Sequence, residues 1–238
     1  MVINMSDKPF VTAVVVAAGN STRMSCYVSK QLIPLLGAPA ISYTLKAFEN
    51  AHTIDEVVIV CRKVDMSELK AIVSEYGFGK VKAFTVGGSE RSDSVKNGVE
   101  AASDCATHFA IHDGARALIT AHDIDKVVSE AFVCGAATLG APVTDTIKVV
   151  DKNGNIISTP DRASLMAVQT PQVFERNIYL RALENAKGKG FTDDCGMVEE
   201  IGVYPKIIMG DHHNLKLTTQ ADIPMAETIL KKRQESEV

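Results

Sequence analysis

The sequence VTAVVVAAGNSTRM, residues 11–24, places an apolar run directly before a turn of small residues. The run Val11–Ala17 has the length and the β-branched composition of a buried strand. In an open α/β sheet, the segment that follows the carboxyl end of such a strand borders the ligand crevice. The stretch therefore predicts the first strand of a sheet and one wall of a binding site.

Further apolar runs and amphipathic helical patterns alternate along the chain. The runs are Val57–Cys61, Val81–Val86, His108–His112 and Ala137–Val143, and the helical patterns lie at 39–48, 69–76, 95–102, 124–132 and 178–186. Three helical patterns are followed by the glycine that commonly ends a helix, at Gly77, Gly135 and Gly188. This alternation predicts a doubly wound α/β fold with a mostly parallel sheet. The length of 238 residues suits a single domain, residues 1–238, with a frayed tail at 231–238.

One segment, residues 143–162, breaks this rhythm. Within it, TIKVVDKNGNIIST at 146–159 predicts two short strands joined by an Asn153-Gly154 turn. A two-stranded hairpin is only marginally stable unless its faces pack on something else. We therefore expect a projecting β-arm that packs on a second subunit in a homodimer. The alternative is an insertion packed on its own domain.

The composition argues against several classes of protein. A net charge of −4 does not supply the clustered positive surface that sequence-independent nucleic-acid binding needs. No apolar run approaches the roughly 20 residues that span a bilayer. Residues 1–10 carry Asp7 and Lys8 where a signal peptide has its apolar centre, and the five cysteines lack a C-x-x-C pair. We expect a cytoplasmic protein with reduced thiols and neither a nucleic-acid nor a membrane partner.

The turn after the first predicted strand has features of a phosphate site. Of the three glycines in a dinucleotide-binding fingerprint only Gly19 is present, which disfavours an NAD-dependent oxidoreductase, and a Walker loop is also missing. Two cations, Arg23 and Lys30, flank backbone N–H groups that can bind oxyanions. The arrangement suits a triphosphate, although an ordinary surface loop with two solvated cations fits the loop alone equally well.

Four other clusters carry polar chemistry. GGSERSDS at 87–94 can approach a base or ribose, or can simply start a helix with Ser89 or Ser92 as its N-cap. IHDGAR at 111–116 puts Asp113 at a strand end, where a carboxylate meets a metal or a substrate hydroxyl, or forms a turn. TDD at 192–194 predicts a helix N-terminus, and NLKLT at 214–218 predicts a strand with an inward Lys216. The histidines at 108 and 112 alternate along a strand and do not form a helical metal pair.

Taken together, the motifs resemble one family of enzymes. They are, in order, AAGNSTRM, SKQ, GGSERSDS, IHDGAR, APVTDTIK, TPDR, QTPQVF, FTDD and NLKLTT. Their order and spacing, from Val11 to Ile229, are similar to those of 2-C-methyl-D-erythritol 4-phosphate cytidylyltransferase. The resemblance implies a Rossmann-like nucleotidyltransferase fold and transfer of CMP from CTP to a polyol phosphate, with Mg²⁺ as the usual cofactor. It also implies that the arm reaches across a dimer interface into the neighbour's site.

The resemblance assigns roles to residues of this chain. It implies catalytic roles for Arg23, Lys30, Arg162 and Lys216, and nucleotide contacts for Ala17, Ala18, Gly19, Ser21, Gly88, Ser89, Ser94, Asp113 and Gly114. The implied acceptor contacts are Arg116, Thr146, Arg162, Thr192 and Lys216. Asp113 is also the candidate metal contact, with Mg²⁺ held mainly by the phosphates.

The chain departs from the family pattern at four positions. Ser21 stands where glycine is usual, which would strain a backbone with positive φ. Ser29 replaces a proline and should increase mobility around Lys30. Ser89 stands where an acid is common, and Ala117 where proline is common. The alternatives to the methylerythritol phosphate enzyme are a ribitol 5-phosphate cytidylyltransferase, which shares the nucleotide loop, and a catalytically silent nucleotide-binding module.

Overall fold

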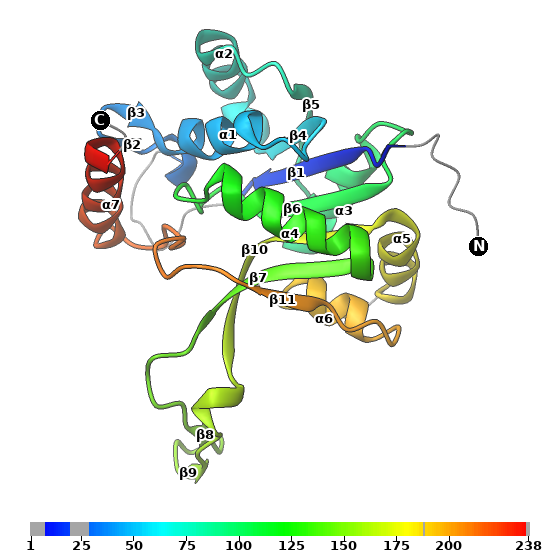
Figure 1. Cartoon of the computed structure of the whole chain (residues 1–238), viewed down its shortest axis with the longest axis vertical. Helices are drawn as coiled ribbons and strands as arrows, with labels where there is room; N and C mark the ends of the chain where they lie inside the picture. Colours follow the sequence, from blue (N-terminus) through cyan, green and yellow to red (C-terminus); the bar gives the residue numbers. More distant parts are fainter. Residues whose placement is uncertain (1–7, 20–28, 188, 237–238) are drawn as a thin grey trace.

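A computed structural model describes residues 8–19, 29–187 and 189–236, and in this part of the chain a seven-stranded sheet forms the centre (Figure 1). Its strand order is β11-β7-β10-β6-β1-β4-β5. The strands are β1 (Val11–Ala17), β4 (Glu56–Cys61), β5 (Val81–Val86), β6 (His108–Asp113), β7 (Ala136–Pro142), β10 (Met166–Glu175) and β11 (Lys206–Met209). The five strands predicted from the sequence are confirmed within one or two residues at each end.

The sheet is mixed but mostly parallel. β1 pairs in parallel with β4 and β6, β4 with β5, and β7 with β11, whereas β10 runs antiparallel to both β6 and β7. The apolar runs did not predict β10, because Gln169, Pro171 and Gln172 interrupt its pattern and proline is unusual inside a strand. The pairing accommodates them with a register shift between Val168 and Gln172.

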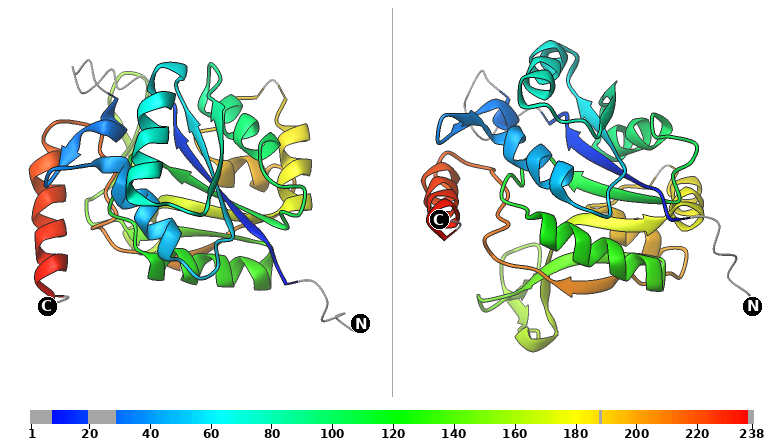
Figure 2. Two further views of the ribbon diagram at one scale, coloured as in Figure 1. Left: turned by 90° about the horizontal axis from the view of Figure 1, so that it is seen from above. Right: turned by 45° about the horizontal axis from the view of Figure 1, so that its top comes forward.

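Helices cover both faces of the sheet, as the doubly wound prediction requires (Figure 2). The helices α1 (Ala40–Asn50), α2 (Met66–Tyr76) and α4 (Ala121–Cys134) pack on one face, and α3 (Arg91–Glu100), α5 (Arg176–Asn185) and α6 (Asp194–Glu199) pack on the other. Alternate residues of β1 pack against the helices on the two faces of the sheet, because successive side chains of a strand point to opposite faces. Ala13 and Val15 join the first apolar cluster, and Val14 joins the second.

The helix ends confirm some predictions and correct others. Gly77 and Gly135 end α2 and α4 with φ of 68° and 78°. α5 ends at Asn185, earlier than predicted, and Gly188 lies outside the described residues. The frayed tail was wrong for 231–236, because α7 (Asp222–Ser236) continues to Ser236. Its weak apolar periodicity hid a helix whose Ala226 and Leu230 pack in one cluster with Leu35 of β2 (Pro34–Leu35), the strand that pairs with β3 (Ala38–Pro39).

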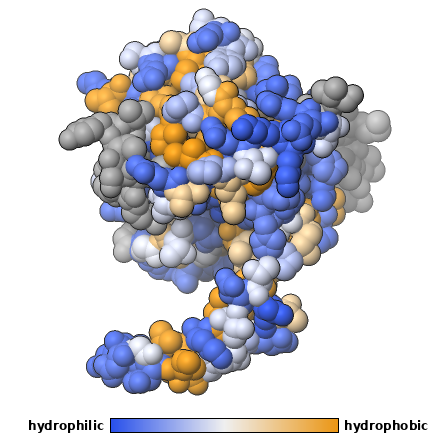
Figure 3. Space-filling model, turned by 90° about the vertical axis from the view of Figure 1, so that its left-hand side faces the viewer, coloured by the Kyte–Doolittle hydropathy of each residue, from blue (hydrophilic) through white to orange (hydrophobic). Residues whose placement is uncertain are grey.

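The segment between β7 and β10 forms the predicted arm. It contains β8 (Val149–Val150) and β9 (Ile156–Ser158), with Gly154 at φ 86° in the turn between them. Figure 1 shows the arm standing clear of the body, and Figure 3 shows apolar residues on its surface. Every residue of both strands is exposed, so the alternative of a hairpin packed on its own domain was wrong. The exposed large apolar residues are Ile147, Val149, Val150, Ile156 and Ile157.

The order of the strands places a crevice beside β1. The chain runs from β1 outward through β4 to β5, and then returns to the other side of β1 as β6. At such a reversal, the connections leave neighbouring strands in opposite directions and open a ligand crevice at the carboxyl ends. Val16 lies opposite Asp113 in the β1–β6 pairing, so both strand ends border this crevice. Within the described part of the chain, no helix is long and apolar enough to cross a bilayer.

Candidate active site

A cavity of about 240 Å³ lies at the carboxyl ends of β1, β5 and β6. It is lined by Val16, Ala18, Gly19, Lys30, Gln31, Gly88, Ser89, Glu90, Arg91, Ser94, Asp113, Ala115 and Lys216. Eight of the residues proposed from the sequence therefore meet in one place, although they come from five separate segments of the chain. The cavity contains three cations, Lys30, Arg91 and Lys216, so it can receive a strongly anionic ligand.

Two further predicted residues form the support behind the cavity. Ala17 is buried and pairs with Cys61 of β4. The Gly114 N–H donates to the Val16 carbonyl at 2.9 Å. A Cβ at Gly114 would lie 3.2 Å from both that carbonyl oxygen and the Ile41 Cδ1, tighter than ordinary contact. Small side chains at these positions let β1, β6 and α1 approach closely and hold the crevice walls in place.

The glycine pair after β5 brings the second loop close to β1. A Cβ on Gly87 would lie 2.3 Å from the Ala18 Cβ, and one on Gly88 would lie 2.2 Å from the Asp93 Cβ. Neither position can therefore carry a larger side chain without movement of its neighbours. The loop presents its backbone to the cavity as the sequence led us to expect.

The start of α3 differs from both N-caps considered in the sequence. Glu90 is the N-cap, and its capping box with Asp93 satisfies backbone N–H groups at the helix start. The Ser89 hydroxyl donates to the Asp93 carboxylate at 2.7 Å. The Ser94 hydroxyl accepts from the Gly88 N–H and donates to the Glu90 carbonyl, both at 3.1 Å. These bonds fix the shape of the loop that lines the cavity.

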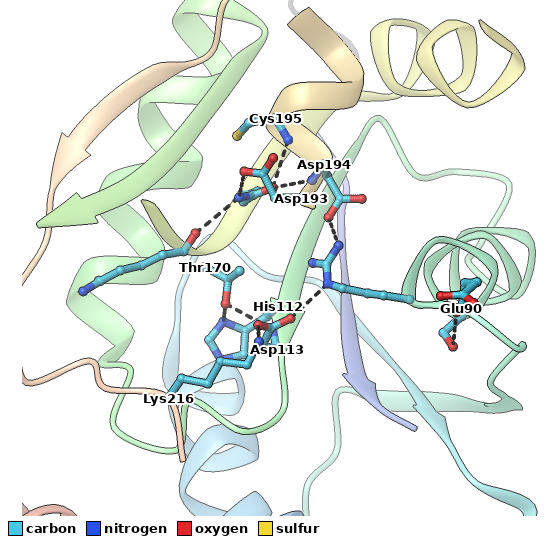
Figure 4. A network of polar contacts seen from close by, with 12 residues as sticks. Glu90, His112, Asp113, Thr170, Asp193, Asp194, Cys195 and Lys216 are labelled. Atoms are coloured by element: carbon cyan, nitrogen blue, oxygen red, sulfur yellow. Dashed lines mark hydrogen bonds and ion pairs between the residues drawn. The ribbon is translucent and has the colours of Figure 1, made fainter. Parts of the chain in front are cut away.

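Asp113 lies between two cations at the end of β6 (Figure 4). Its Oδ2 is 2.5 Å from the Lys216 Nζ, and its Oδ1 is 3.3 Å from the Arg91 Nε. Burial alone would raise the pKa of Asp113, but Arg91 and Lys216 hold that pKa well below its usual range. The carboxylate therefore stays ionised at neutral pH and orients both cations toward the cavity.

Arg91 also binds a second carboxylate, which the sequence analysis did not foresee. Its Nη1 is 2.7 Å from the Asp194 Oδ2, and the Asp194 Oδ1 accepts a hydrogen bond of 2.6 Å from the Tyr179 hydroxyl. Burial would lower the pKa of Arg91, but Asp194 and Asp113 raise it above its ordinary value. One guanidinium thus links α3, β6 and α6. The only signal in the sequence was an arginine inside the GGSERSDS motif.

The N-terminus of α6 is held by a side chain of β10. Asp193 is the N-cap, so the TDD motif does begin a helix, but Thr192 lies before the cap and does not line the cavity. The Gln172 Oε1 accepts from the backbone N–H groups of Asp194 and Cys195 at 3.0 and 3.1 Å. Its Nε2 donates to Asp193 at 2.9 Å. Gln172 thereby positions the carboxylate that binds Arg91.

His112 supports Asp113 from inside the core. The ring is fully buried, and burial lowers its pKa to about 3, so it is neutral at physiological pH. The Arg116 carbonyl, 3.3 Å from the Nε2, can only accept, so the Nε2 of the neutral ring carries the proton and donates to it. The Nδ1 then accepts from the Thr170 hydroxyl at 3.1 Å, and that hydroxyl itself accepts from the Asp113 N–H at 3.1 Å. This histidine has a structural role, and no group of His, Cys, Asp and Glu suited to hold a metal occurs among the described residues.

The segment 214–218 is not the strand that its sequence predicted. Among the described residues, one backbone–backbone hydrogen bond, from the Leu217 N–H to the Ala115 carbonyl at 2.8 Å, joins it to the body of the domain. The Asn214 carbonyl accepts from the Arg116 Nη1 at 2.7 Å. Lys216 reaches the cavity from this extended loop, whereas Arg116 lies beside the cavity without lining it. Burial lowers the pKa of Arg116, and its Nε has no hydrogen-bond partner in the described chain.

The remaining predicted residues lie elsewhere. Thr146 and Arg162 are exposed on the arm, where the Arg162 Nη1 donates to the Thr144 carbonyl at 2.7 Å, and neither lines the cavity of its own chain. Arg23 and Ser21 lie outside the described residues. Ser29 is buried and hydrogen-bonded, and the mobility expected around Lys30 from the loss of proline stays a prediction.

Replacing Arg91 with methionine should destabilise the protein by about 3 kcal/mol at pH 7, because two buried carboxylates lose their shared partner. The folded pKa of Asp113 lies below its unfolded value, so this contribution is present at neutral pH. It is lost as the pH falls through the unfolded carboxyl pKa of about 4 towards the folded one.

Urea unfolding of the wild type and of Arg91→Met measures the effect, with the exposed Arg181→Met of α5 as a control that should match the wild type. The difference in the free energy of unfolding between the wild type and Arg91→Met should shrink as the pH falls from roughly 5 to 3. A difference that stays constant over this range would contradict the assignment of Arg91 to Asp113.

An open α/β sheet with a cationic cavity at its switch point, closed by a glycine-rich loop, defines a nucleotide-binding protein of the doubly wound class. Comparison with known proteins makes this more specific. The family model for 2-C-methyl-D-erythritol 4-phosphate cytidylyltransferase matches residues 11–232. The chain belongs to this family and is therefore an enzyme, a cytidylyltransferase.

Individual relatives agree over nearly the whole length. The chain is 39% identical over 225 residues to the 2-C-methyl-D-erythritol 4-phosphate cytidylyltransferase of Caldanaerobacter subterraneus, covering 93% of this chain and 99% of the relative. It is 41% identical to that of Alkaliphilus oremlandii, covering 94% and 96%. The crystal structure of 4-diphosphocytidyl-2C-methyl-D-erythritol synthase from Anaerococcus prevotii superposes with a TM-score of 0.84 at 27% identity, covering 94% and 96%. The fold expected from the resemblance is thus confirmed.

Proposed function

We propose that the chain transfers CMP from CTP to 2-C-methyl-D-erythritol 4-phosphate in isoprenoid biosynthesis. An oxygen of the acceptor phosphate bonds to the α-phosphorus of CTP, and the bond from that phosphorus to the bridging oxygen breaks. The products are 4-diphosphocytidyl-2-C-methyl-D-erythritol and pyrophosphate. The observation that carries the proposal is the cavity at the β1–β6 crevice, where Lys30 and Lys216 face the loops at 18–19 and 88–94. Both substrates are water-soluble, and we place the reaction in the cytoplasm.

The reaction needs no nucleophilic side chain, because the acceptor phosphate is itself the nucleophile. Catalysis then depends on aligning two anions in line and on stabilising the charge that develops on the departing pyrophosphate. Lys30, which begins the short helix η2 (Lys30–Leu32) and lines the cavity, is proposed to contact the triphosphate. Arg23, on the segment outside the described residues, is proposed as the second cation on the same loop.

Lys216 is proposed to hold the phosphate of the acceptor. Its ammonium group lies at the cavity wall, where the Asp113 carboxylate fixes its direction. An incoming phosphate can share this ammonium group, because the Lys216 side chain is 36% exposed. Asp113 is left to accept a hydrogen bond from a ligand hydroxyl, with Ser89, Ser94 and the Gly88 backbone beside it for the nucleoside.

The donor set in the cavity fits a divalent cation only in part. Each oxygen of Asp113 already contacts a cation, Oδ1 that of Arg91 and Oδ2 that of Lys216, so a metal ion would share one of these oxygens. Glu90, the other carboxylate of the cavity lining, caps α3. Mg²⁺ commonly takes one or two carboxylates together with phosphate oxygens and water, which agrees with a contact from Asp113 alone. We propose that Asp113 is the one protein contact and that the phosphates hold the rest of the shell. When bound, Mg²⁺ would neutralise phosphate charge.

The arm supports the proposal of a homodimer. Arg162 and Thr146 cannot act on the cavity of their own chain, because they lie on the projecting arm and not among its lining residues. The exposed apolar residues of the hairpin would be buried by a second copy. In the proposed assembly, Arg162 contacts the acceptor phosphate in the neighbour's cavity, so each site depends on both subunits.

Pyrophosphate release tests the function directly. The purified protein with Mg²⁺ should release pyrophosphate with CTP and methylerythritol phosphate, and much more slowly with ATP, GTP or UTP. Ribitol 5-phosphate in place of methylerythritol phosphate tests the alternative acceptor. Release with ribitol phosphate only would replace the proposed acceptor, and no release with either would contradict the enzyme assignment altogether.

A further inference from the structure

Ser29 belongs to a buried polar network that joins the end of the first loop to β4. The residue is 2% exposed. Its hydroxyl donates to the Asp65 Oδ2 at 2.6 Å and accepts from the Arg62 Nη2 at 2.5 Å. Arg62 in turn holds both carboxylate oxygens of Asp65, at 2.7 and 2.8 Å. The three side chains form a closed ring of hydrogen bonds.

The partners of Ser29 are fixed parts of the sheet edge. Arg62 directly follows β4, and Asp65 ends the short helix η3 (Lys63–Asp65) that leads into α2. Burial alone would raise the pKa of Asp65, but Arg62 and the Ser29 hydroxyl lower it. The same bonds raise the pKa of Arg62. The pair is therefore charged at neutral pH and presents a rigid, strongly polar socket for the serine.

Lys30 is the next residue after Ser29. The Ser29 carbonyl accepts from the Leu32 N–H at 2.8 Å, and both Gln31 and Leu32 are buried. The backbone is thus held on each side of Lys30, whose side chain lines the cavity. A lysine side chain is long and flexible, so the position of its backbone decides which part of the cavity its ammonium group can reach.

We propose that Ser29 is a positioning residue for Lys30, and that the ring of Ser29, Arg62 and Asp65 sets the affinity for the triphosphate of the nucleotide. The inference rests on the proposed function, in which Lys30 contacts CTP. When the backbone of Lys30 is held in place, the residue has less conformational freedom to lose on binding the triphosphate. The acceptor binds through other residues and should not sense the change.

The backbone of Ser29 is compatible with the proline that the family resemblance implies for this position. Its φ of −56° and ψ of 133° lie in the range that proline itself adopts. The hydrogen bonds of the Ser29 side chain therefore stabilise a backbone conformation that a proline would fix by its covalent ring. Ser29→Pro should keep the position of Lys30, whereas Ser29→Ala removes the side-chain bonds and supplies no replacement.

Calorimetric titration with CTP, without acceptor, tests this in the full-length protein. Ser29→Ala should weaken CTP binding by about fivefold to tenfold, and Ser29→Pro should stay within about twofold of the wild type. Ser42→Ala is the matched control: that serine is also buried, at 4% exposure, and its hydroxyl donates to the Pro39 carbonyl. In steady-state assays, Ser29→Ala should raise the KM for CTP and leave the KM for the acceptor unchanged.

Asp65→Asn provides a second route should Ser29→Ala not fold. It keeps the shape of the side chain, weakens the ring, and should also lower CTP affinity selectively. Its effect and that of Ser29→Ala should not add, because both act through one network. Unchanged CTP affinity in Ser29→Ala, or equal losses in Ser29→Ala and Ser42→Ala, would overturn the inference. Failure of the wild type to bind CTP would instead refute the proposed function, and this inference with it.

Discussion

Lys30→Ala is expected to reduce turnover with CTP by about 10²- to 10³-fold. Lys30 lines the cavity. It begins η2, directly after the loop that follows β1. Charge accumulates on the departing pyrophosphate as the bond to the α-phosphorus breaks, so loss of the cation should lower kcat as well as weaken CTP binding. Arg23→Ala is expected to have a similar effect.

The rate of pyrophosphate release measures this loss, and far-UV circular dichroism with thermal unfolding checks that the fold is intact. Lys46→Ala, which removes an exposed lysine from α1, is the matched control and should behave as the wild type. Near-normal turnover in both Lys30→Ala and Arg23→Ala would mean that the phosphate-binding loop has been misassigned.

Arg162→Ala is expected to be nearly inactive alone, yet to regain activity when mixed with the equally inactive Lys30→Ala. In a mixed dimer, the Arg162→Ala chain supplies an intact cavity and the Lys30→Ala chain supplies an intact arm. One of the two sites then holds both cations. With free exchange of subunits, about a quarter of all sites should recover.

The control for this experiment carries both substitutions in one chain. Mixed with wild type, the double variant Lys30→Ala/Arg162→Ala gives heterodimers in which each site lacks one of the two cations. These heterodimers should be inactive, so activity should fall below that of the wild type alone. If differently tagged chains are shown to exchange and no activity returns in the first mixture, Arg162 does not act across the interface.

The sequence predicted those parts of the fold whose signals are local. β1 and α4 have continuous apolar patterns and, for α4, a terminal glycine, so both were located closely. β10 was not, because its interior carries Gln172 for a contact with α6. The helix α7 was missed because it buries only Ala226 and Leu230, which leaves little periodicity to detect.

The site shows the same division between local and distant information. Ala18, Gly88 and Asp113 lie in recognisable motifs at strand ends, and the sheet topology was enough to bring them together. Arg91 was not assigned, because its partners lie 22 and 103 residues away and only the folded chain shows them. The role of Ser29 was likewise hidden. A comparison with proline predicts only that the rigid proline side chain is lost, and it does not predict the two hydrogen bonds that the serine hydroxyl makes.

The strand β10 connects the base of the arm to the site through contacts that depend on register. Its first residues pair with the end of β7 beside the arm, Thr170 binds the Asp113 N–H, and Gln172 holds α6. Because side chains alternate along a strand, a slip of β10 by one residue against β6 would exchange the faces of Gln172 and Val173. A change of length at the tip of the hairpin should therefore leave these contacts intact, whereas a change at its junction with β10 should disturb them.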